Sequence, residues 1–292
     1  MPSNFNHILQ QTLGSGIELI QSRPLSGGDI HQAWRLDTNQ GSWFIKINHT
    51  SAIAMFASEA EALKQIQASQ TIRCPQVMAF GQTEHQAWLL LEYIDLQSQG
   101  DDFLRGQQLA QMHRHTADQF GWPTDNFIGH TVQLNHQQSN WQQFYVEQRL
   151  RPQLTLAQQN GAPSQLIANA ERLIAGLDAF FVDYQPQASL LHGDLWGGNS
   201  AFDHRGQPVI FDPASYYGDR ETDLAMTELF GGFSDDFYRG YQTEWPLDAS
   251  YHRRKLLYNL YHILNHFNLF GGHYALQAQR LIDALLNGRA NL

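Results

Sequence analysis

The sequence predicts an α+β protein made of two lobes, a small β-rich N-terminal lobe and a larger, mostly helical C-terminal lobe. Strand-like runs rich in β-branched and aromatic residues are concentrated before residue 95, and apolar residues at helical spacing dominate after it. A polar stretch at residues 95–102 separates the two patterns. We therefore expect one domain at residues 1–94 and a second at 95–292.

The composition is that of an ordinary soluble globular protein. The 292 residues are 42% hydrophobic and 16% charged, and the formal net charge is −10. This acidic balance argues against nucleic acid or an anionic membrane as the main partner, because both select basic surfaces. The single cysteine, Cys74, permits no internal disulfide and suits a reducing compartment. With no signal-like or membrane-length apolar run, we expect a cytoplasmic protein. The sequence sets no oligomeric state.

The first elements of the chain are expected to be a short helix at residues 7–13 and strands on either side of a glycine pair. That pair, Gly27 and Gly28, lies between two strand-like segments. Glycines there allow a backbone to approach phosphates closely, but a plain hairpin turn explains them equally well.

A lysine interrupts the next strand-like run. Lys46 lies among apolar residues in the segment 42–47, where burying an unpaired ammonium is costly. It is similar to the strand lysine of kinases, which binds nucleotide phosphates and a helix glutamate. We expect Glu59 in the following helical segment to be its partner, with Glu61 in reserve. The alternative is an exposed lysine on an edge strand.

Two further strands are expected at residues 77–81 and 87–94. In a kinase layout the second strand leads into the connection between the lobes. Backbone groups of Glu92, Tyr93 and Ile94 are then expected to hold an adenine ring.

Three polar residues in the middle of the chain have the spacing of a kinase active site. Asp194 closes the triplet His-Gly-Asp, Asn199 follows five positions later, and Asp212 ends a short apolar run at 208–211. Kinases place a catalytic aspartate, a metal-binding asparagine and a second metal-binding aspartate in this order. Asparagine and aspartate supply the oxygen ligands that Mg²⁺ takes. The alternative is that all three residues only cap turns and end a strand.

The C-terminal half repeats apolar residues at helical spacing, for example at 166–181 and 258–269. Asp223 is expected near the start of a helix, holding the loop of Asp194 from below. His262 and His266 share one helical stripe with tyrosine and asparagine. That stripe fits either a substrate pocket or a hydrogen-bonded helix interface.

Four blocks of sequence resemble the fructosamine kinase (ketosamine-3-kinase) family. They are HGDLWGGN at 192–199, the DPA-YYGDRE-DLAM block at 212–226, LFGGF at 229–233 and LYHILNH at 260–266. The pattern HGD-x₄-N alone is shared with aminoglycoside and choline kinases. The tryptophan and glycines inside it, together with the last two blocks, are more specific.

The resemblance implies a protein-kinase-like fold, ATP and Mg²⁺ as cofactors, and phosphorylation of the sugar C3 hydroxyl of ketosamines. The acceptors would be small-molecule ketosamines or glycated protein lysines, and the activity would serve deglycation repair. The implied roles are Asp194 as base, Asn199 and Asp212 as metal ligands, Lys46 with Glu59 at the phosphates, Trp196 near the sugar, and His262 and His266 as weaker pocket residues. Two alternatives stay open: a kinase for another hydroxyl acceptor, such as an aminoglycoside or choline, and a non-catalytic nucleotide-binding scaffold.

Overall fold

The computed structural model describes residues 4–25 and 31–288, and the chain divides into two compact units. The N-terminal unit is Met1–Asp101 with Ala201–Asp212, and the C-terminal unit is Asp102–Ser200 with Pro213–Leu292. The N-terminal unit thus takes residues 95–101 and a later hairpin, in addition to the segment 1–94 that the sequence analysis assigns to the first domain.

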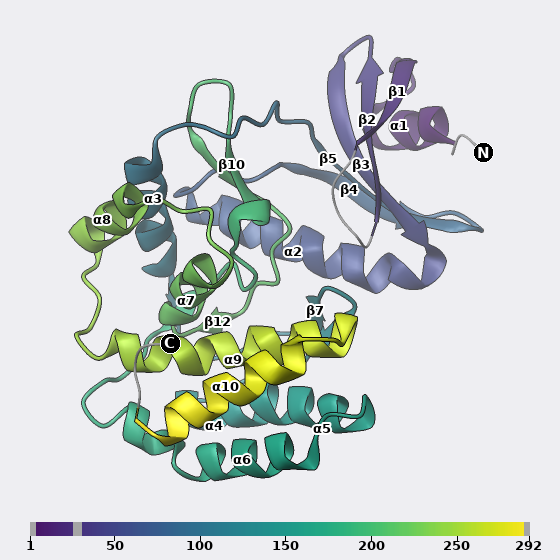
Figure 1. Cartoon of the computed structure of the whole chain (residues 1–292). Helices are drawn as coiled ribbons and strands as arrows, with labels where there is room; N and C mark the ends of the chain where they lie inside the picture. Colours follow the sequence, from purple (N-terminus) through teal and green to yellow (C-terminus); the bar gives the residue numbers. More distant parts are fainter. Residues whose placement is uncertain (1–3, 26–30, 289–292) are drawn as a thin grey trace. The chain divides into compact units, whose positions relative to one another are not determined.

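A five-stranded antiparallel sheet forms the centre of the N-terminal unit, in the order β1-β2-β3-β5-β4 (Figure 1). Its strands are β1 (Leu19–Leu25), β2 (Gln32–Thr38), β3 (Gly41–His49), β4 (Val77–Gln82) and β5 (Gln86–Glu92). The helices of this unit are α1 (Phe5–Leu13) and α2 (Ile53–Ser69), with a 3₁₀ turn at Thr50–Ala52.

The two faces of β3 serve different purposes. Ile45 and Ile47 are buried in a cluster with Phe5 and Leu9 of α1. Lys46 lies between them in sequence, so its side chain leaves the opposite face of the strand, where it meets Glu59 of α2. The alternation of the strand therefore places one charged side chain against α2 while its neighbours build the apolar core.

A later hairpin completes the N-terminal unit. Strands β10 (Ser200–Phe202) and β11 (Pro208–Ile210) pair with each other. Arg73 bridges to Val209, and its guanidinium donates to the Asp203 carboxylate at 2.5 Å. The hairpin is thereby held to the unit, and the segment of the unit that contains it ends at Asp212.

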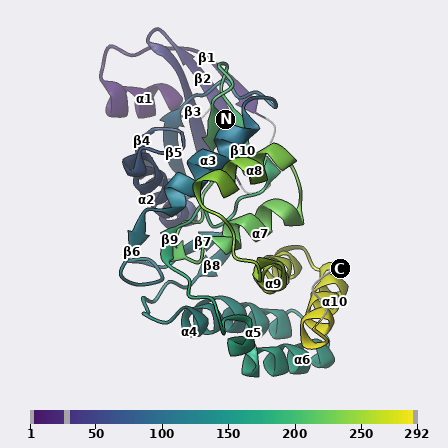
Figure 2. The same ribbon diagram turned by 90° about the vertical axis from the view of Figure 1, so that its left-hand side faces the viewer.

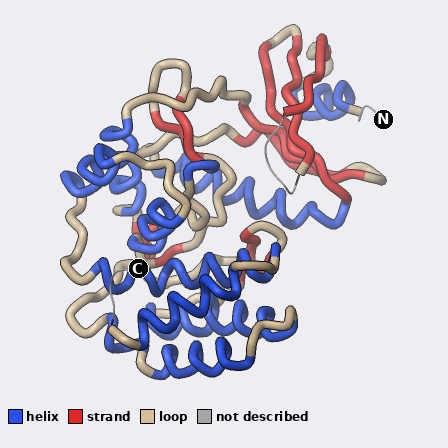
Figure 3. Tube along the Cα trace, in the orientation of Figure 1, coloured by secondary structure: helices blue, strands red, loops and turns tan. Residues whose placement is uncertain are grey.

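The C-terminal unit is mostly helical (Figure 3). Its helices are α3 (Asp102–His113), α4 (Trp141–Tyr145), α5 (Arg151–Gln159), α6 (Ser164–Ala175), α7 (Glu221–Leu229), α8 (Asp235–Glu244), α9 (Tyr251–Phe270) and α10 (Tyr274–Leu286). A π-helical turn at Val146–Leu150 joins α4 to α5, and 3₁₀ turns occupy Leu177–Phe180 and Gly197–Asn199. Helix α3 packs on α8, and α9 packs on α7, α10 and α5 (Figure 2).

Short strands in this unit lead into the loop that carries the His-Gly-Asp triplet. One small sheet has the order β12-β9-β6, and β7 pairs with β8. The bounds are β6 (Thr116–Ala117), β7 (Asn126–Ile128), β8 (Thr131–Gln133), β9 (Ala188–Leu190) and β12 (Tyr217–Gly218). Strand β9 ends two residues before His192, so the sheet sets where the His-Gly-Asp triplet begins.

The α+β fold class is confirmed, with the strand-rich and helix-rich parts in the predicted halves of the chain. The expected helix at 166–181 divides into α6 and the 3₁₀ turn at Leu177–Phe180. Strands β1 and β2 are the two strands expected on either side of the glycine pair. Within residues 4–25 and 31–288, no helix is both long and apolar enough to cross a lipid bilayer.

A buried ion pair ties α7 to α9. Arg254 donates to both carboxylate oxygens of Glu221, at 2.7 and 2.9 Å, and neither side chain is exposed. Burial and the nearby charge of Asp219 raise the pKa of Glu221 to about 7, while Arg254 opposes this shift. The two charges are thus removed from water and compensate each other.

Arg254→Met is expected to lower the free energy of unfolding by about 3–5 kcal/mol, because it leaves an uncompensated buried carboxylate. The matched control is Arg151→Met, which removes an exposed pair with Glu171 and should cost less than about 1 kcal/mol. Urea denaturation measures both. Equal costs for the two variants would contradict this account of the buried pair.

Candidate active site

The loop that carries Asp194 is anchored by the carboxylate of Asp223. The backbone N–H of His192 donates to Asp223 Oδ2 at 2.7 Å, and that of Gly193 donates to Oδ1 at 2.8 Å. Asp223 lies in the first turn of α7 and is 1% exposed. Both oxygens of one buried carboxylate therefore fix two successive peptide units of the loop, as the sequence analysis expected for Asp223.

Only glycine fits the middle position of the triplet. Gly193 has φ +83°, and a Cβ atom there would lie 2.1 Å from the carbonyl oxygen of Ala214. The adjacent N–H of Ala214 donates to the carbonyl of His192 at 2.8 Å. The loop backbone thus lies directly against the segment that follows Asp212 in sequence.

His113 supports Asp223 from the other side. Its Nε2 lies 3.1 Å from Asp223 Oδ2, and its Nδ1 lies 2.7 Å from the Tyr241 hydroxyl. Burial lowers the pKa of His113, although the hydrogen bond with Asp223 opposes this. The ring is then neutral at pH 7, with Nε2–H donating to Asp223 and Nδ1 accepting from Tyr241.

The Asp223 side chain is held in its charged form. Burial raises its pKa, but the hydrogen bonds from His113 and from the Gly193 backbone outweigh burial, so its pKa lies below the ordinary value. A carboxylate with this many donors is stabilised as an anion.

Asp194 and Asn199 are brought together by the loop. The Asn199 amide nitrogen donates to the Asp194 carbonyl at 2.8 Å and to Asp194 Oδ2 at 3.1 Å. Both of these hydrogen bonds use the amide nitrogen, so the amide oxygen is the Asn199 atom suited to a metal ion. Asn199 is 7% exposed, and Asp194 is half-buried.

Lys46, Glu59 and Asp212 form a second charged group, in the N-terminal unit. Lys46 Nζ donates to Glu59 Oε1 at 2.8 Å and also to Asp212 Oδ1. Burial lowers the pKa of Lys46, but the charges of Asp212 and Glu59 raise it above the ordinary value. The lysine is therefore a permanent cation. Its partner is the predicted Glu59, whereas Glu61 is exposed.

Asp212 has an unusual backbone conformation. Its φ is +57°, one of two positive values among the described residues other than glycine. Aspartate tolerates the left-handed region better than most residues, yet the conformation is strained and concentrates at functional sites. Its side chain is 43% exposed while one oxygen binds the buried Lys46. The turn thus presents a carboxylate that is both anchored and accessible.

Each of the two units carries one of the residues that the sequence analysis expected at a magnesium ion. Asn199 and Asp212 supply hard oxygen atoms, and Mg²⁺ is commonly bound by one or two such groups plus phosphate oxygens and water. Among residues 4–25 and 31–288, no group of three or more His, Cys, Asp or Glu side chains gathers to hold a metal alone. Asn199, in the C-terminal unit, and Asp212, in the N-terminal unit, are each of a residue type that supplies one oxygen ligand to a metal bound with a nucleotide.

The residues expected around the nucleotide, two glycines at the phosphates and three residues at the adenine, are only partly described. Gly27 and Gly28 lie outside the described residues. The backbone N–H of Glu92 donates to the Gln76 carbonyl at 2.8 Å, so it is already bound. Tyr93 and Ile94 follow the end of β5, where the backbone has left the sheet. Their role at an adenine ring stays a prediction.

The expected substrate residues differ in accessibility. Trp196 is 41% exposed, and His266 is half-buried. His262 is 4% exposed, and burial lowers its pKa to about 3. An assignment to substrate contact therefore suits Trp196 and His266 better than His262.

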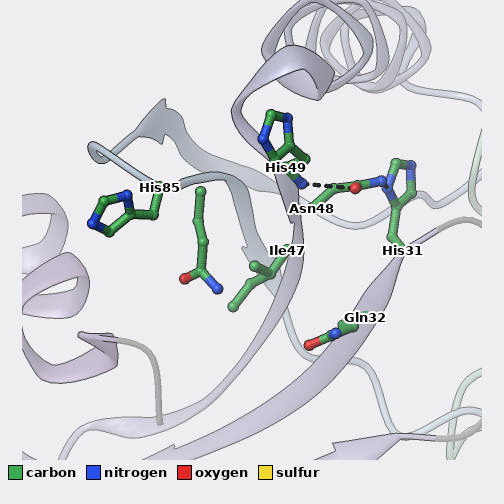
Figure 4. A pocket seen from close by; sticks show the side chains of 7 residues that line it. His31, Gln32, Ile47, Asn48, His49 and His85 are labelled. Atoms are coloured by element: carbon green, nitrogen blue, oxygen red, sulfur yellow. Dashed lines mark hydrogen bonds between the residues drawn. The ribbon is translucent and has the colours of Figure 1, made fainter. Parts of the chain in front are cut away.

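A separate hollow of about 420 Å³ lies at one end of the N-terminal sheet (Figure 4). It is lined by His31, Gln32, Ile47, Asn48, His49, His85 and Gln86. Asn48 links two of these residues, accepting from the His49 backbone at 2.7 Å and contacting the His31 ring at 2.8 Å. Lys46, Glu59 and Asp212 do not line it, so it is distinct from the charged group described above.

Sequence reasoning missed the role of His113. The sequence analysis gives it no functional role, and the structure places it in the core, in contact with the carboxylate that anchors the loop. The two residues are 110 positions apart. No local spacing could have paired them, because the contact depends on how α3 packs in the C-terminal unit.

The comparisons with known proteins agree on one family. A family model described as fructosamine kinase matches residues 1–288. A protein from Synechocystis sp. that is named as a ketoamine kinase is 42% identical over 285 residues, and the alignment covers 95% of this chain and 94% of that protein. The chloroplastic protein-ribulosamine 3-kinase of Arabidopsis thaliana is 38% identical over 279 residues, covering 94% and 85%.

Solved structures give the same result for the fold. A crystal structure assigned as a fructosamine-3-kinase from Haemophilus somnus has a TM-score of 0.88 and 28% identity, covering 97% of this chain and 96% of that one. The aminoglycoside phosphotransferase APH(4)-Ia has a TM-score of 0.64 at 16% identity, covering 98% and 97%, which shows a shared fold alone. The chain therefore has a protein-kinase-like fold.

Asp223→Asn is expected to lower the free energy of unfolding at pH 7 by roughly 1–3 kcal/mol, because an amide cannot accept from all the buried donors. The pKa of Asp223 is lower in the folded state, so this stabilisation is complete above about pH 4 and is lost as the pH falls through the folded-state pKa. Denaturation at pH 7 and at lower pH measures the difference.

The matched control for this experiment is Asp178→Asn, an exposed carboxylate in the same unit. It should change stability by less than about 0.5 kcal/mol. An Asp223→Asn protein that is as stable as the wild type would show that the carboxylate does not anchor the loop.

Proposed function

Because the chain belongs to the fructosamine kinase family, we propose that it is an ATP-dependent kinase that phosphorylates the C3 hydroxyl of ketosamines. The observation that carries this proposal is the anchored loop, in which Asp223 fixes the backbone and Asn199 orients Asp194. The names of the relatives support a ketosamine as the acceptor, in the form of a fructosamine or a ribulosamine.

Asp194 is the catalytic base in this proposal. Its carboxylate accepts the proton of the C3 hydroxyl as that oxygen bonds to the γ-phosphorus of ATP, and the bond from phosphorus to the departing ADP oxygen breaks. The hydrogen bond from the Asn199 amide holds one oxygen of Asp194 and so limits rotation of the carboxylate. A base that is already oriented needs no rearrangement at the moment of transfer.

The remaining site residues are assigned to the nucleotide and its metal ion. We assign Lys46, held by Glu59, to the phosphates, and Asn199 and Asp212 to Mg²⁺. The metal, when bound, neutralises charge on the phosphates. Gly27 and Gly28 are assigned to the phosphates, and Glu92, Tyr93 and Ile94 to the adenine. The raised pKa of Lys46 supports its role, because the ammonium keeps its charge at any physiological pH.

The sugar is assigned to the surface beside the anchored loop. Trp196 follows Asp194 by two residues and presents an exposed indole, whose face can cover the apolar side of a sugar. His266 and His262 are assigned to the sugar as weaker contacts. Free ketosamines and glycated protein lysines are both acceptors in this proposal.

A cytoplasmic setting is part of this proposal, and the single cysteine, which permits no internal disulfide, is consistent with it. Burial raises the pKa of the Cys74 thiol to about 12, so this thiol is unreactive.

Purified protein with ATP and Mg²⁺ is expected to phosphorylate 1-deoxy-1-morpholinofructose and a ribulosamine, but not kanamycin or choline. Coupled ADP release measures turnover. Turnover on kanamycin or choline alone would keep the kinase and overturn the substrate. Failure on all four, with nucleotide binding intact, would favour a scaffold.

Asp194→Asn is expected to reduce kcat by about 10²–10⁴-fold, with small changes in the KM of either substrate, because it removes the base and preserves the shape of the side chain. Asp178→Asn serves again as the exposed control and should turn over normally. Near-normal kcat in the Asp194 variant, with its fold verified by circular dichroism, would remove Asp194 from the proton transfer.

A further inference from the structure

Five aromatic rings in the C-terminal unit form a continuous row that begins at Trp196. The ring centroids of Trp196 and Phe230 are 6.4 Å apart, and those of Phe230 and His266 are 4.8 Å apart. His266 in turn lies 5.7 Å from Phe270 and 5.2 Å from Tyr274. We call these five residues the aromatic row. It joins the loop of Asp194 to the ends of α7, α9 and α10.

The first ring of the row is exposed but held in place. A Cβ atom at Gly198 would lie 2.3 Å from the Trp196 indole, so the indole covers the backbone of its own loop at that position. A Cβ atom at Gly232 would lie 2.6 Å from Gly197 Cα, so this loop also packs backbone to backbone against the residues after Phe230. The glycines of the two sequence blocks therefore set the distance between Trp196 and Phe230.

Three rings of the row are partly in contact with water. Trp196 is 41% exposed, Phe230 is 38% exposed and Phe270 is 59% exposed. Exposed apolar groups that lie together usually mark a binding surface. Within the described C-terminal unit, this row is continuous with the loop that carries the proposed base, which indicates that it serves the same reaction.

The chemistry of the row favours a cation with an apolar chain. Aromatic faces carry partial negative charge and attract ammonium groups. The row contains no lysine or arginine. Burial lowers the pKa of His266, although its backbone hydrogen bond opposes this, so the ring is neutral at pH 7. An anionic ligand would gain no ion pair from these five residues, whereas a cation meets no repulsion from them.

We propose that the aromatic row binds the amine side of the ketosamine, with the protonated secondary nitrogen at Trp196 and Phe230 and the attached chain along Phe270 and Tyr274. This inference rests on the proposed function. A ketosamine bears its nitrogen on C1, close to the C3 hydroxyl, and Trp196 is close to Asp194 in the same loop. The row thereby selects N-linked sugars over free or O-linked ketoses.

The test uses two acceptors of nearly equal shape that differ in charge. One is the fructosamine of benzylamine, and the other is 1-O-benzylfructose, in which a neutral ether oxygen replaces the ammonium. For the wild type, kcat/KM for the amine is expected to exceed that for the ether by about tenfold or more. This comparison requires no variant, so it stands even if a variant fails to fold.

Two variants assign the preference to the row. Trp196→Leu and Phe230→Leu are each expected to raise the KM for the amine by about fivefold to tenfold, to change kcat by less than about threefold, and to reduce the preference over the ether. Phe230→Tyr should keep the preference, because it retains the ring. Leu276→Ala, at an exposed apolar residue of α10 outside the row, should match the wild type.

The outcomes separate this inference from the proposed function. If the wild type phosphorylates the amine and the ether equally well, the ketose kinase activity stands and the role of the row is overturned. A preference that persists in both leucine variants also overturns it. If the wild type phosphorylates neither compound nor any ketosamine, the proposed function fails and the inference fails with it.

Discussion

The arrangement of the C-terminal unit around its functional loop depends on the buried carboxylate of Asp223. This anion accepts two successive backbone N–H groups and the ring of His113, and these donors keep its pKa low despite burial. Because Asp223 binds the backbone, the side chains of Asp194 and Trp196 do not have to hold the loop. Neutral His113, oriented by Tyr241, adds a donor without adding a second buried charge. One structural ion thus fixes the loop that carries the proposed base.

The N-terminal unit also contains a buried charge that is stabilised by hydrogen bonds, but here the charge is positive. The buried ammonium of Lys46 on β3 is tolerated because Glu59 and Asp212 accept hydrogen bonds from it, and their charges raise its pKa above the ordinary value. Asp212 reaches Lys46 from a turn with positive φ and keeps much of its side chain exposed. The cluster of one cation and two carboxylates is therefore suited to receive further positive charge, as a metal ion bound with phosphates would bring.

Local patterns in the sequence predicted much of this arrangement. The apolar run around Lys46 and the helical spacing of Glu59 indicated a strand and a helix in contact, and the structure has that contact. The spacing of Asp194 and Asn199 indicated a shared loop, which the hydrogen bonds between them describe. Features that depend on tertiary packing could not be predicted from the sequence. The grouping of β10 and β11 with the N-terminal unit depends on Arg73, far away in sequence, and the approach of Gly197 to Gly232 depends on how two loops meet.

The position of the phosphoryl group in the product is the most direct test of the central claim, that this chain transfers phosphate to the C3 hydroxyl of a ketosamine. Proton–phosphorus correlation NMR on the product formed from ATP and a fructosamine reports which sugar proton couples to phosphorus. We predict coupling to the proton on C3 alone, with no such product from the Asp194→Asn protein. Coupling to the proton of another carbon, or an unmodified sugar beside hydrolysed ATP, would contradict the account.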